Sequence, residues 1–316
     1  MLNLNKGIVT SFLLGLVVHW SFGQSPTGDV DRAEWMRDQG GGPIVDTGTS
    51  NGVENGQAVS TPNDSDMGEQ QILKRQTEYL PFTAAAGTTV FYTSNAALTH
   101  HGDRGDVVTA PLAAVYYEPK ITNNLYAFAD VRQQFFYYGN YHDLDFGSLD
   151  VEAGLSYSVP ELDNLILRAE YDFNRLTSSD RVLDEFFSNH SLILNAEWPY
   201  RISRNQLLSL GTDANLSLGA DHQFPRRNDY EVYAGYSIYL TRQFILSGAG
   251  RFTVRDYHQN DRTDESEILS ISATYRLTPW WDVSAVSTFA HNNSNQESFD
   301  YNVANLGGSL AFSLKF

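Results

Sequence analysis

The clearest alternation of apolar and polar positions lies at the end of the chain. From Ala304 to Phe316 every second residue is apolar or glycine, and the residues between them are small or polar. A period of two with two unlike faces predicts a β-strand that lies between two different environments. In water the apolar face and open edge of such a strand would favour aggregation, whereas a closed barrel in lipid satisfies both. The pattern therefore favours a membrane-spanning β-barrel.

Similar runs alternate with turn-rich gaps from residue 87 onward. They predict about twelve strands, at 87–98, 107–118, 125–138, 148–159, 165–176, 190–200, 206–220, 230–240, 244–256, 268–277, 281–291 and 303–316. The gaps after even strands are short, and those after odd strands are mostly longer and more polar, such as 177–189 and 257–267. Short turns on one rim and long loops on the other are typical of a transmembrane barrel. An even strand count returns the C-terminus to the short-turn rim.

The two faces are easiest to assign in the middle of the chain. In the run 165–176 we expect Leu167 and Tyr171 to face lipid, and Arg168, Glu170 and Asp172 to face inward. The runs 206–220 and 244–256 sort in the same way, whereas the first two runs do not sort cleanly. A charge on the lipid face costs roughly 2–4 kcal/mol at the membrane midplane, so these assignments are strongly constrained.

The last residue is an aromatic, Phe316, and Leu314, Phe312 and Leu310 alternate before it. This ending resembles the C-terminal signature of bacterial outer-membrane β-barrel proteins, and no motif indicates one named family. The resemblance implies an all-β fold, an antiparallel up-and-down barrel of about twelve strands, in the cell outer membrane. It also implies that these four residues form an assembly signal for the barrel-assembly machinery. We expect a monomer in outer-membrane lipid, with both termini in the periplasm.

The amino-terminal region divides into two parts. Residues 1–23 combine Lys6, a short apolar run and small residues at Ser21 and Gly23, which predicts a signal peptide. Residues 24–86 are rich in glycine and turn residues, and predict a flexible or partly helical periplasmic leader. A plug or tether and a disordered leader are both consistent with this composition. Residues 87–316 then form the barrel.

Composition narrows the function classes. The chain has 316 residues, a net charge of −17, no cysteine and 13% aromatic residues. Its mean hydropathy of −0.35 is too low for a helical membrane protein and fits half-apolar strands. The acidic balance argues against a nucleic-acid partner, because such binding depends on Lys and Arg contacts to phosphate. Without cysteine there are no disulfides and no thiolate metal sites.

Charged residues at inward positions are the main candidates for function. We predict that the lumen is lined by Asp130, Arg132, Asp150, Glu152, Arg168, Glu170, Asp172, Asp213, Glu231, Arg251, Arg255 and Arg276. Such a mixed set can line a narrow pore. Alternatively, the side chains pair across a small interior and fill it.

Other candidate chemistry is weaker. Histidines lie near acids in the expected loops, but their spacing indicates no metal site, and no cofactor is expected. Asp221 and His222 resemble one local pair of the outer-membrane proteases, but no second acid pair at a matching spacing accompanies them. We therefore predict no catalytic residues. The adhesion tripeptide Arg104–Asp106 is too short to carry a function.

Two functions remain. The first is a porin-like passive channel for small solutes. The alternative is a structural or surface-interaction barrel with a filled lumen, which acts through its extracellular loops.

Overall fold

The protein forms a closed β-barrel in a computed structural model that describes residues 80–178, 181–259 and 261–316. Its strands are β1 (Phe82–Thr93), β2 (Asp106–Tyr117), β3 (Leu125–Tyr138), β4 (Phe146–Val159), β5 (Leu165–Ser178), β6 (Arg181–Ser203), β7 (Gln206–Asp221), β8 (Arg227–Tyr239), β9 (Phe244–Tyr257), β10 (Thr263–Thr278), β11 (Trp281–Ser294) and β12 (Tyr301–Lys315). Three short 3-10 turns lie in loops, namely η2 (His142–Leu144), η3 (Pro160–Leu162) and η4 (Glu297–Phe299). The described residues contain no helix that is long and apolar enough to cross a membrane.

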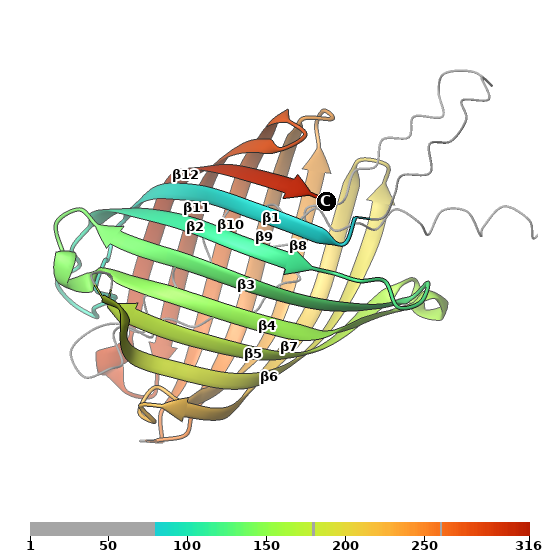
Figure 1. Cartoon of the computed structure of the whole chain (residues 1–316). Helices are drawn as coiled ribbons and strands as arrows, with labels where there is room; N and C mark the ends of the chain where they lie inside the picture. Colours follow the sequence, from blue (N-terminus) through green and yellow to red (C-terminus); the bar gives the residue numbers. More distant parts are fainter. Residues whose placement is uncertain (1–79, 179–180, 260) are drawn as a thin grey trace, which may run out of the picture.

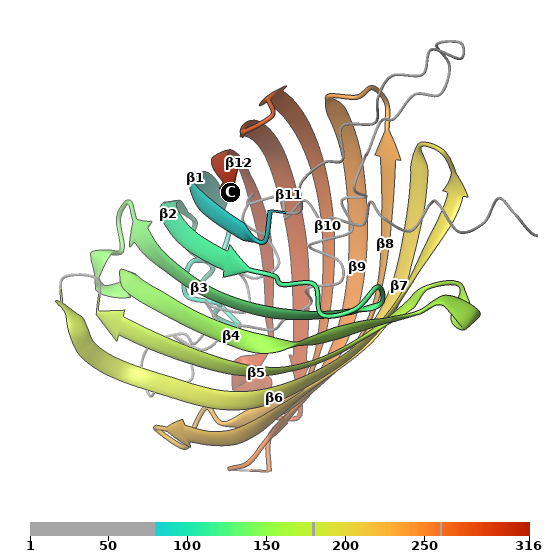
Figure 2. The same ribbon diagram turned by 45° about the vertical axis from the view of Figure 1, so that its right-hand side comes forward.

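Every strand pairs antiparallel with its neighbour in sequence, and β12 returns to pair with β1 (Figures 1 and 2). The closing seam includes the last residue, because the backbone nitrogen of Phe316 donates to the Phe82 carbonyl at 3.0 Å and the reverse bond is 3.2 Å. The two phenyl rings also stack, with centroids 5.7 Å apart. Closure leaves no free strand edge, which a barrel in lipid requires.

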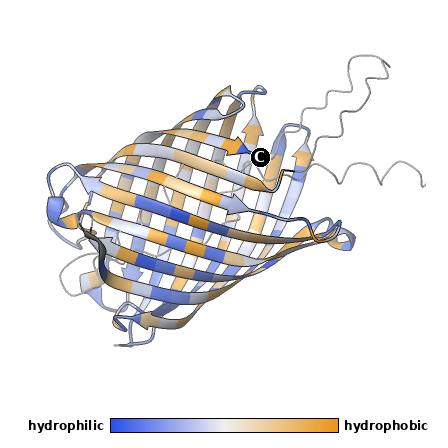
Figure 3. Cartoon of the chain, viewed as in Figure 1, coloured by the Kyte–Doolittle hydropathy of each residue, from blue (hydrophilic) through white to orange (hydrophobic). Residues whose placement is uncertain are grey.

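The outer and inner faces of the barrel wall differ in polarity. Large apolar side chains such as Tyr171, Tyr230 and Phe252 are exposed on the outside, and the residues before and after each of them are polar and buried inside. Hydrophobic and hydrophilic residues are interspersed along the strands (Figure 3). This agrees with the predicted alternation in β5, β7 and β9. The outward positions of β12 also match, since Leu310, Leu314 and Phe316 are exposed.

The two strands that the sequence could not sort have small or apolar residues on both faces. In β2, Val107, Val115 and Tyr117 point outward, whereas Val108 and Tyr116 are buried on the inside. An apolar inner face removes the contrast on which sequence patterns depend.

Strand bounds differ from prediction at the ends. β1 begins at Phe82 and ends at Thr93, whereas the pattern predicted 87–98, because residues 83–86 already pair with β12. The predicted loop 177–189 is mostly strand, since β5 ends at Ser178 and β6 begins at Arg181. The start of β6 has apolar residues at adjacent positions, Phe186 and Phe187, so alternation does not reveal it.

The rims differ less in loop length than predicted, because β6, β8, β10 and β11 extend into the expected long loops. One rim carries the connections 118–124, 160–164, 204–205, 240–243 and 279–280, which we call the short-turn rim. The other, which we call the long-loop rim, carries the remaining connections, of which 94–105 is the longest.

Candidate functional site

The inner wall carries a network of charged side chains from β3 to β10. Of the predicted lumen residues, the acids Asp130, Asp150, Glu152, Glu170, Asp172, Asp213 and Glu231 are buried, as are Arg251 and Arg255. Arg132, Arg168 and Arg276 are partly buried. The barrel thus brings all twelve to its inner face. Strand alternation alone places them there, because each occupies an inward position of its strand.

The densest part of the network lies on β3, β4 and β5. Arg132 donates from Nη2 to Glu152 Oε1 at 2.8 Å, and its Nε lies 3.6 Å from Asp150. Asn174 donates to Asp150 at 2.7 Å, and Ser191 of β6 donates to Asp172 at 3.2 Å. Amides and hydroxyls here hold carboxylates that one guanidinium cannot satisfy alone.

The network continues across β6 to β9. The Asn195 side-chain amide donates to Asp213 at 2.5 Å and to the Tyr233 hydroxyl at 3.0 Å. Thr253 donates to Glu231 at 2.7 Å, and Arg251 Nε lies 3.5 Å from the same carboxylate. The charges on these strands are therefore fixed by side chains of the neighbouring strands.

Four further charged residues extend the network toward the long-loop rim. Arg227 lies 3.1 Å from Asp229 and donates to the Tyr257 hydroxyl at 2.7 Å. Arg262 bonds Asp264 through two nitrogens and lies over the ring of Tyr257, 4.0 Å from its centroid.

These four residues were not predicted to face the lumen, because the sequence pattern indicates loops at 221–229 and 257–267. Arg227 and Asp229 share the parity of Glu231, so extending the alternation of β8 backwards would have found them.

Charged side chains at the short-turn end are more exposed than those in the middle of the lumen. Arg276 lies 3.5 Å from Asp282, and both side chains are partly exposed. Just beyond β2, burial raises the pKa of Glu118, and the positive charges of Arg168 and Lys315 act in the opposite direction. These groups border the opening of the lumen on that rim.

The remaining inner wall, formed by β11, β12, β1 and β2, is almost uncharged. Its inward residues are small or neutral, for example Ser284, Thr288, Ser309, Ala85 and Ala110. Among the described inward side chains of these strands, charge occurs only near the ends, at Asp282, Lys315 and Asp106. The lumen therefore has one charged wall and one neutral wall.

The loop 94–105 folds inward at the long-loop end. Leu98 is 1% exposed and packs with Ile268, Ala290 and Val303 on the inner side of β10, β11 and β12. Asn95 donates to the Asn302 carbonyl at 3.2 Å and fixes the start of the loop. The sequence had placed Leu98 at the end of a strand. The loop narrows the mouth of the barrel over the neutral wall.

An apolar cluster narrows the same end over the other wall. Phe91, Phe136, Phe146 and Phe187 are buried together, each from a different strand between β1 and β6. Two of these rings, Phe136 and Phe146, stack with centroids 4.4 Å apart. Over β1 to β6 the polar lumen is thus bounded at its long-loop end by apolar side chains.

The weaker candidates have structural roles or no assembled site. Asp106 of the adhesion tripeptide is buried and accepts from the backbone nitrogens of Val107, Asn140 and Tyr141. Asp221 accepts from the backbone nitrogen of His222, not from its ring. The described residues contain no group of three His, Asp or Glu side chains arranged to hold a metal ion.

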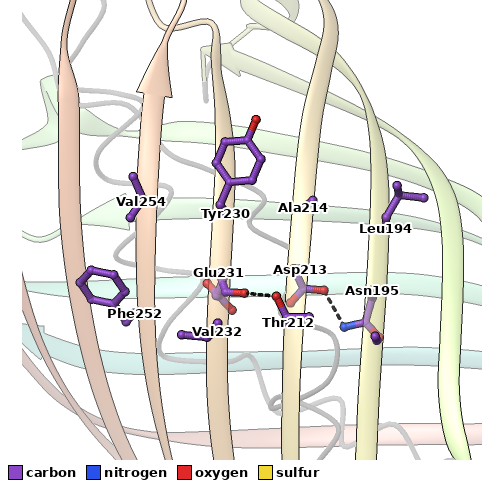
Figure 4. A pocket seen from close by; sticks show the side chains of 11 residues that line it. Leu194, Asn195, Thr212, Asp213, Ala214, Tyr230, Glu231, Val232, Phe252 and Val254 are labelled. Carbon is purple, nitrogen blue, oxygen red and sulfur yellow. Dashed lines mark hydrogen bonds between the residues drawn. The ribbon is translucent and has the colours of Figure 1, made fainter.

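A shallow depression of about 540 Å³ lies on the lipid-facing side of β6 to β9. The outward side chains around it include Leu194, Val232 and Phe252, and small Ala214 leaves space between them (Figure 4). Thr212, which also lines the depression, donates from its hydroxyl to the backbone carbonyl of Glu231 at 2.8 Å and so links β7 to β8. Its apolar lining suits lipid contact.

Known proteins share this architecture at the level of the fold. No family model matches the chain, and no curated protein matches it. Among solved structures, an outer membrane channel from Pseudomonas putida F1 is similar over 76% of this chain and 98% of its own, with 15% identity and a TM-score of 0.52. The translocator domain of the autotransporter NalP from Neisseria meningitidis is similar over 76% and 90%, with 12% identity and a TM-score of 0.44. The chain has the fold of bacterial outer-membrane β-barrels. Likeness at this level concerns the fold and not the activity.

Proposed function

We propose that the protein is a passive channel for small solutes and that it catalyses no reaction. The observation that carries the proposal is the network of charged and polar side chains on the inner wall, to which the strands β3 to β10 contribute. A purely structural barrel can fill its interior with apolar residues, whereas polar groups facing inward favour water and solutes.

We further propose a place and partners for this channel. The barrel sits in outer-membrane lipid as a monomer, with both termini on the periplasmic side and the long-loop rim outside the cell. The outward residues Leu310, Phe312, Leu314 and Phe316 of the last strand serve as the signal for the barrel-assembly machinery.

Planar-bilayer recordings of the purified, refolded chain test the channel. We expect discrete conductance steps in KCl, and a second preparation that lacks residues 24–79 shows whether the leader changes them. Silence in both preparations, with folding verified by heat-modifiable gel mobility, would exclude a passive channel.

A second function is favoured by one observation. The apolar cluster of Phe91, Phe136, Phe146 and Phe187 and the inward loop 94–105 both narrow the long-loop end. If they close it, the protein acts through its outer loops as a surface-interaction barrel. Shortening the loops 222–226 and 295–300 would then abolish binding of a surface partner and leave the barrel folded, whereas lumen substitutions would leave binding intact.

A further inference from the structure

Three carboxylates lie in one row across the inner wall. Asp130 on β3 is opposite Glu152 on β4, and Glu152 is opposite Asp172 on β5. Asp150 and Glu170 occupy the next inward positions of the same strands, and all five side chains are at most 4% exposed. Among the described inward residues of these three strands, Arg132 and Arg168 supply the positive charge. Carboxylates therefore outnumber guanidinium groups.

One of these carboxylates is held differently from its neighbours. Glu152, Asp150 and Asp172 each accept from a side chain on an adjacent strand. Neither carboxylate oxygen of Asp130 has a hydrogen-bond partner among the residues that the structure describes. Burying a carboxylate without a donor is unfavourable, so this position favours a positively charged group.

The surroundings of Asp130 indicate which kind of cation fits. Tyr116 on β2 is opposite Asp130 on the other side and is buried. An aromatic side chain beside a carboxylate suits an ammonium or guanidinium group, which gains from both the charge and the ring. The described acids are not grouped as ligands of a metal ion. The chemistry therefore matches an organic cation.

We propose that Asp130, flanked by Glu152 and Tyr116, binds the ammonium or guanidinium group of a small organic cation that enters the lumen. This subsite rests on the channel function proposed above and names the class of solute. The N–H groups of the cation donate to the Asp130 carboxylate, and its charge offsets the excess of acids on β3 to β5. Cations thereby concentrate at this level of the lumen, whereas neutral and anionic solutes do not.

Block of the KCl current of the full chain by 1,4-diaminobutane tests the subsite. The diamine carries two ammonium groups at neutral pH, and 1,4-butanediol serves as a neutral molecule of the same length. We expect the diamine to reduce the current of the unmodified chain, and Asp130→Asn to require about tenfold more of it. Butanediol should have no such effect on either chain.

A matched control is Asp256→Asn, which removes one carboxylate from an exposed position on β9 and should leave the block unchanged. Equal block in Asp130→Asn and the unmodified chain would overturn the subsite, while the KCl steps would still support the channel. An absence of KCl steps in the unmodified chain contradicts the channel function and, with it, this solute site. Asp130→Ser repeats the comparison if the Asn variant does not refold.

Discussion

The two inner walls of this barrel fill the interior with different kinds of side chain. On β3 to β10 the interior is occupied by long charged side chains that bond one another across neighbouring strands, as Arg132 does with Glu152 at 2.8 Å. On β11, β12, β1 and β2 it is occupied mostly by small neutral residues, and a few larger apolar side chains cover them. The loop residue Leu98 packs with Ala290 and Val303, and Phe91 of β1 covers Gly307.

The two walls should therefore respond differently to substitutions. In a low-dielectric interior, removal of one charged side chain leaves its partners unpaired and destabilises the network that they form. Small residues in close contact depend on shape, so addition of a single methyl group matters most. The charged wall should be sensitive to lost charge, and the neutral wall to added volume.

The largest effect is expected at Arg132→Met. The substitution keeps much of the side-chain volume but removes the guanidinium that bonds Glu152 and lies near Asp150. Removing one member of a buried ion pair costs about 3–5 kcal/mol. The free energy of unfolding in urea, measured in lipid vesicles by tryptophan fluorescence, checks this. Arg276→Met is the control, because its ion pair with Asp282 is partly exposed, and an equal loss there would contradict the role of burial.

A smaller effect is expected on the neutral wall at Gly307→Ala. A Cβ at this position would lie 2.4 Å from the Cβ of Phe91 and 2.5 Å from the Val90 carbonyl oxygen, across the seam that closes the barrel. Overpacking of this kind costs typically about 1–3 kcal/mol. Gly219→Ala is the matched control, since nothing lies within 4 Å of its Cβ. The same unfolding measurement should separate the two, and equal stability would argue against close packing at the seam.

A loss of similar size is expected at Asp106→Asn. This carboxylate is buried at the long-loop end of the neutral wall and accepts from backbone nitrogens, not from a guanidinium. An amide in its place turns one N–H group toward those donors, and the loss should be about 1–3 kcal/mol. Faster proteolysis in the connection 139–145 than in the unmodified chain would reveal the freed loop. Unchanged proteolysis there would contradict the anchoring role.

The sequence predicted much of the fold because the contrast between lipid and lumen repeats every second residue. It indicated twelve strands, the outward face of β12 and the inward positions of Arg132, Glu152 and Asp172. It could not predict where strands end at the long-loop rim, as at β6, where the apolar residues Phe186 and Phe187 are adjacent and alternation is lost. Nor could it predict that Leu98 folds inward, because that depends on a gap between walls that only closure creates. Pairing of Arg132 with Glu152 depends on strand register, which alternation leaves undetermined.

The smallest effect is expected outside the lumen, at Glu185→Gln. Arg175 Nε lies 2.7 Å from Glu185 in the hairpin of β5 and β6, almost the same distance as the nearest contact of Arg132 with Glu152. The Glu185 side chain is 34% exposed, however, whereas that of Glu152 is 1% exposed. Water screens the exposed pair, so its loss should cost at most about 1 kcal/mol in the same unfolding measurement. Because the nitrogen–oxygen distance is matched and burial is not, this pair tests burial as the cause. A cost as large as that of Arg132→Met would mean that contact distance, and not burial, sets the strength of these ion pairs. Buried ion pairs of the charged wall would then stabilise the barrel no more than exposed pairs at the rim.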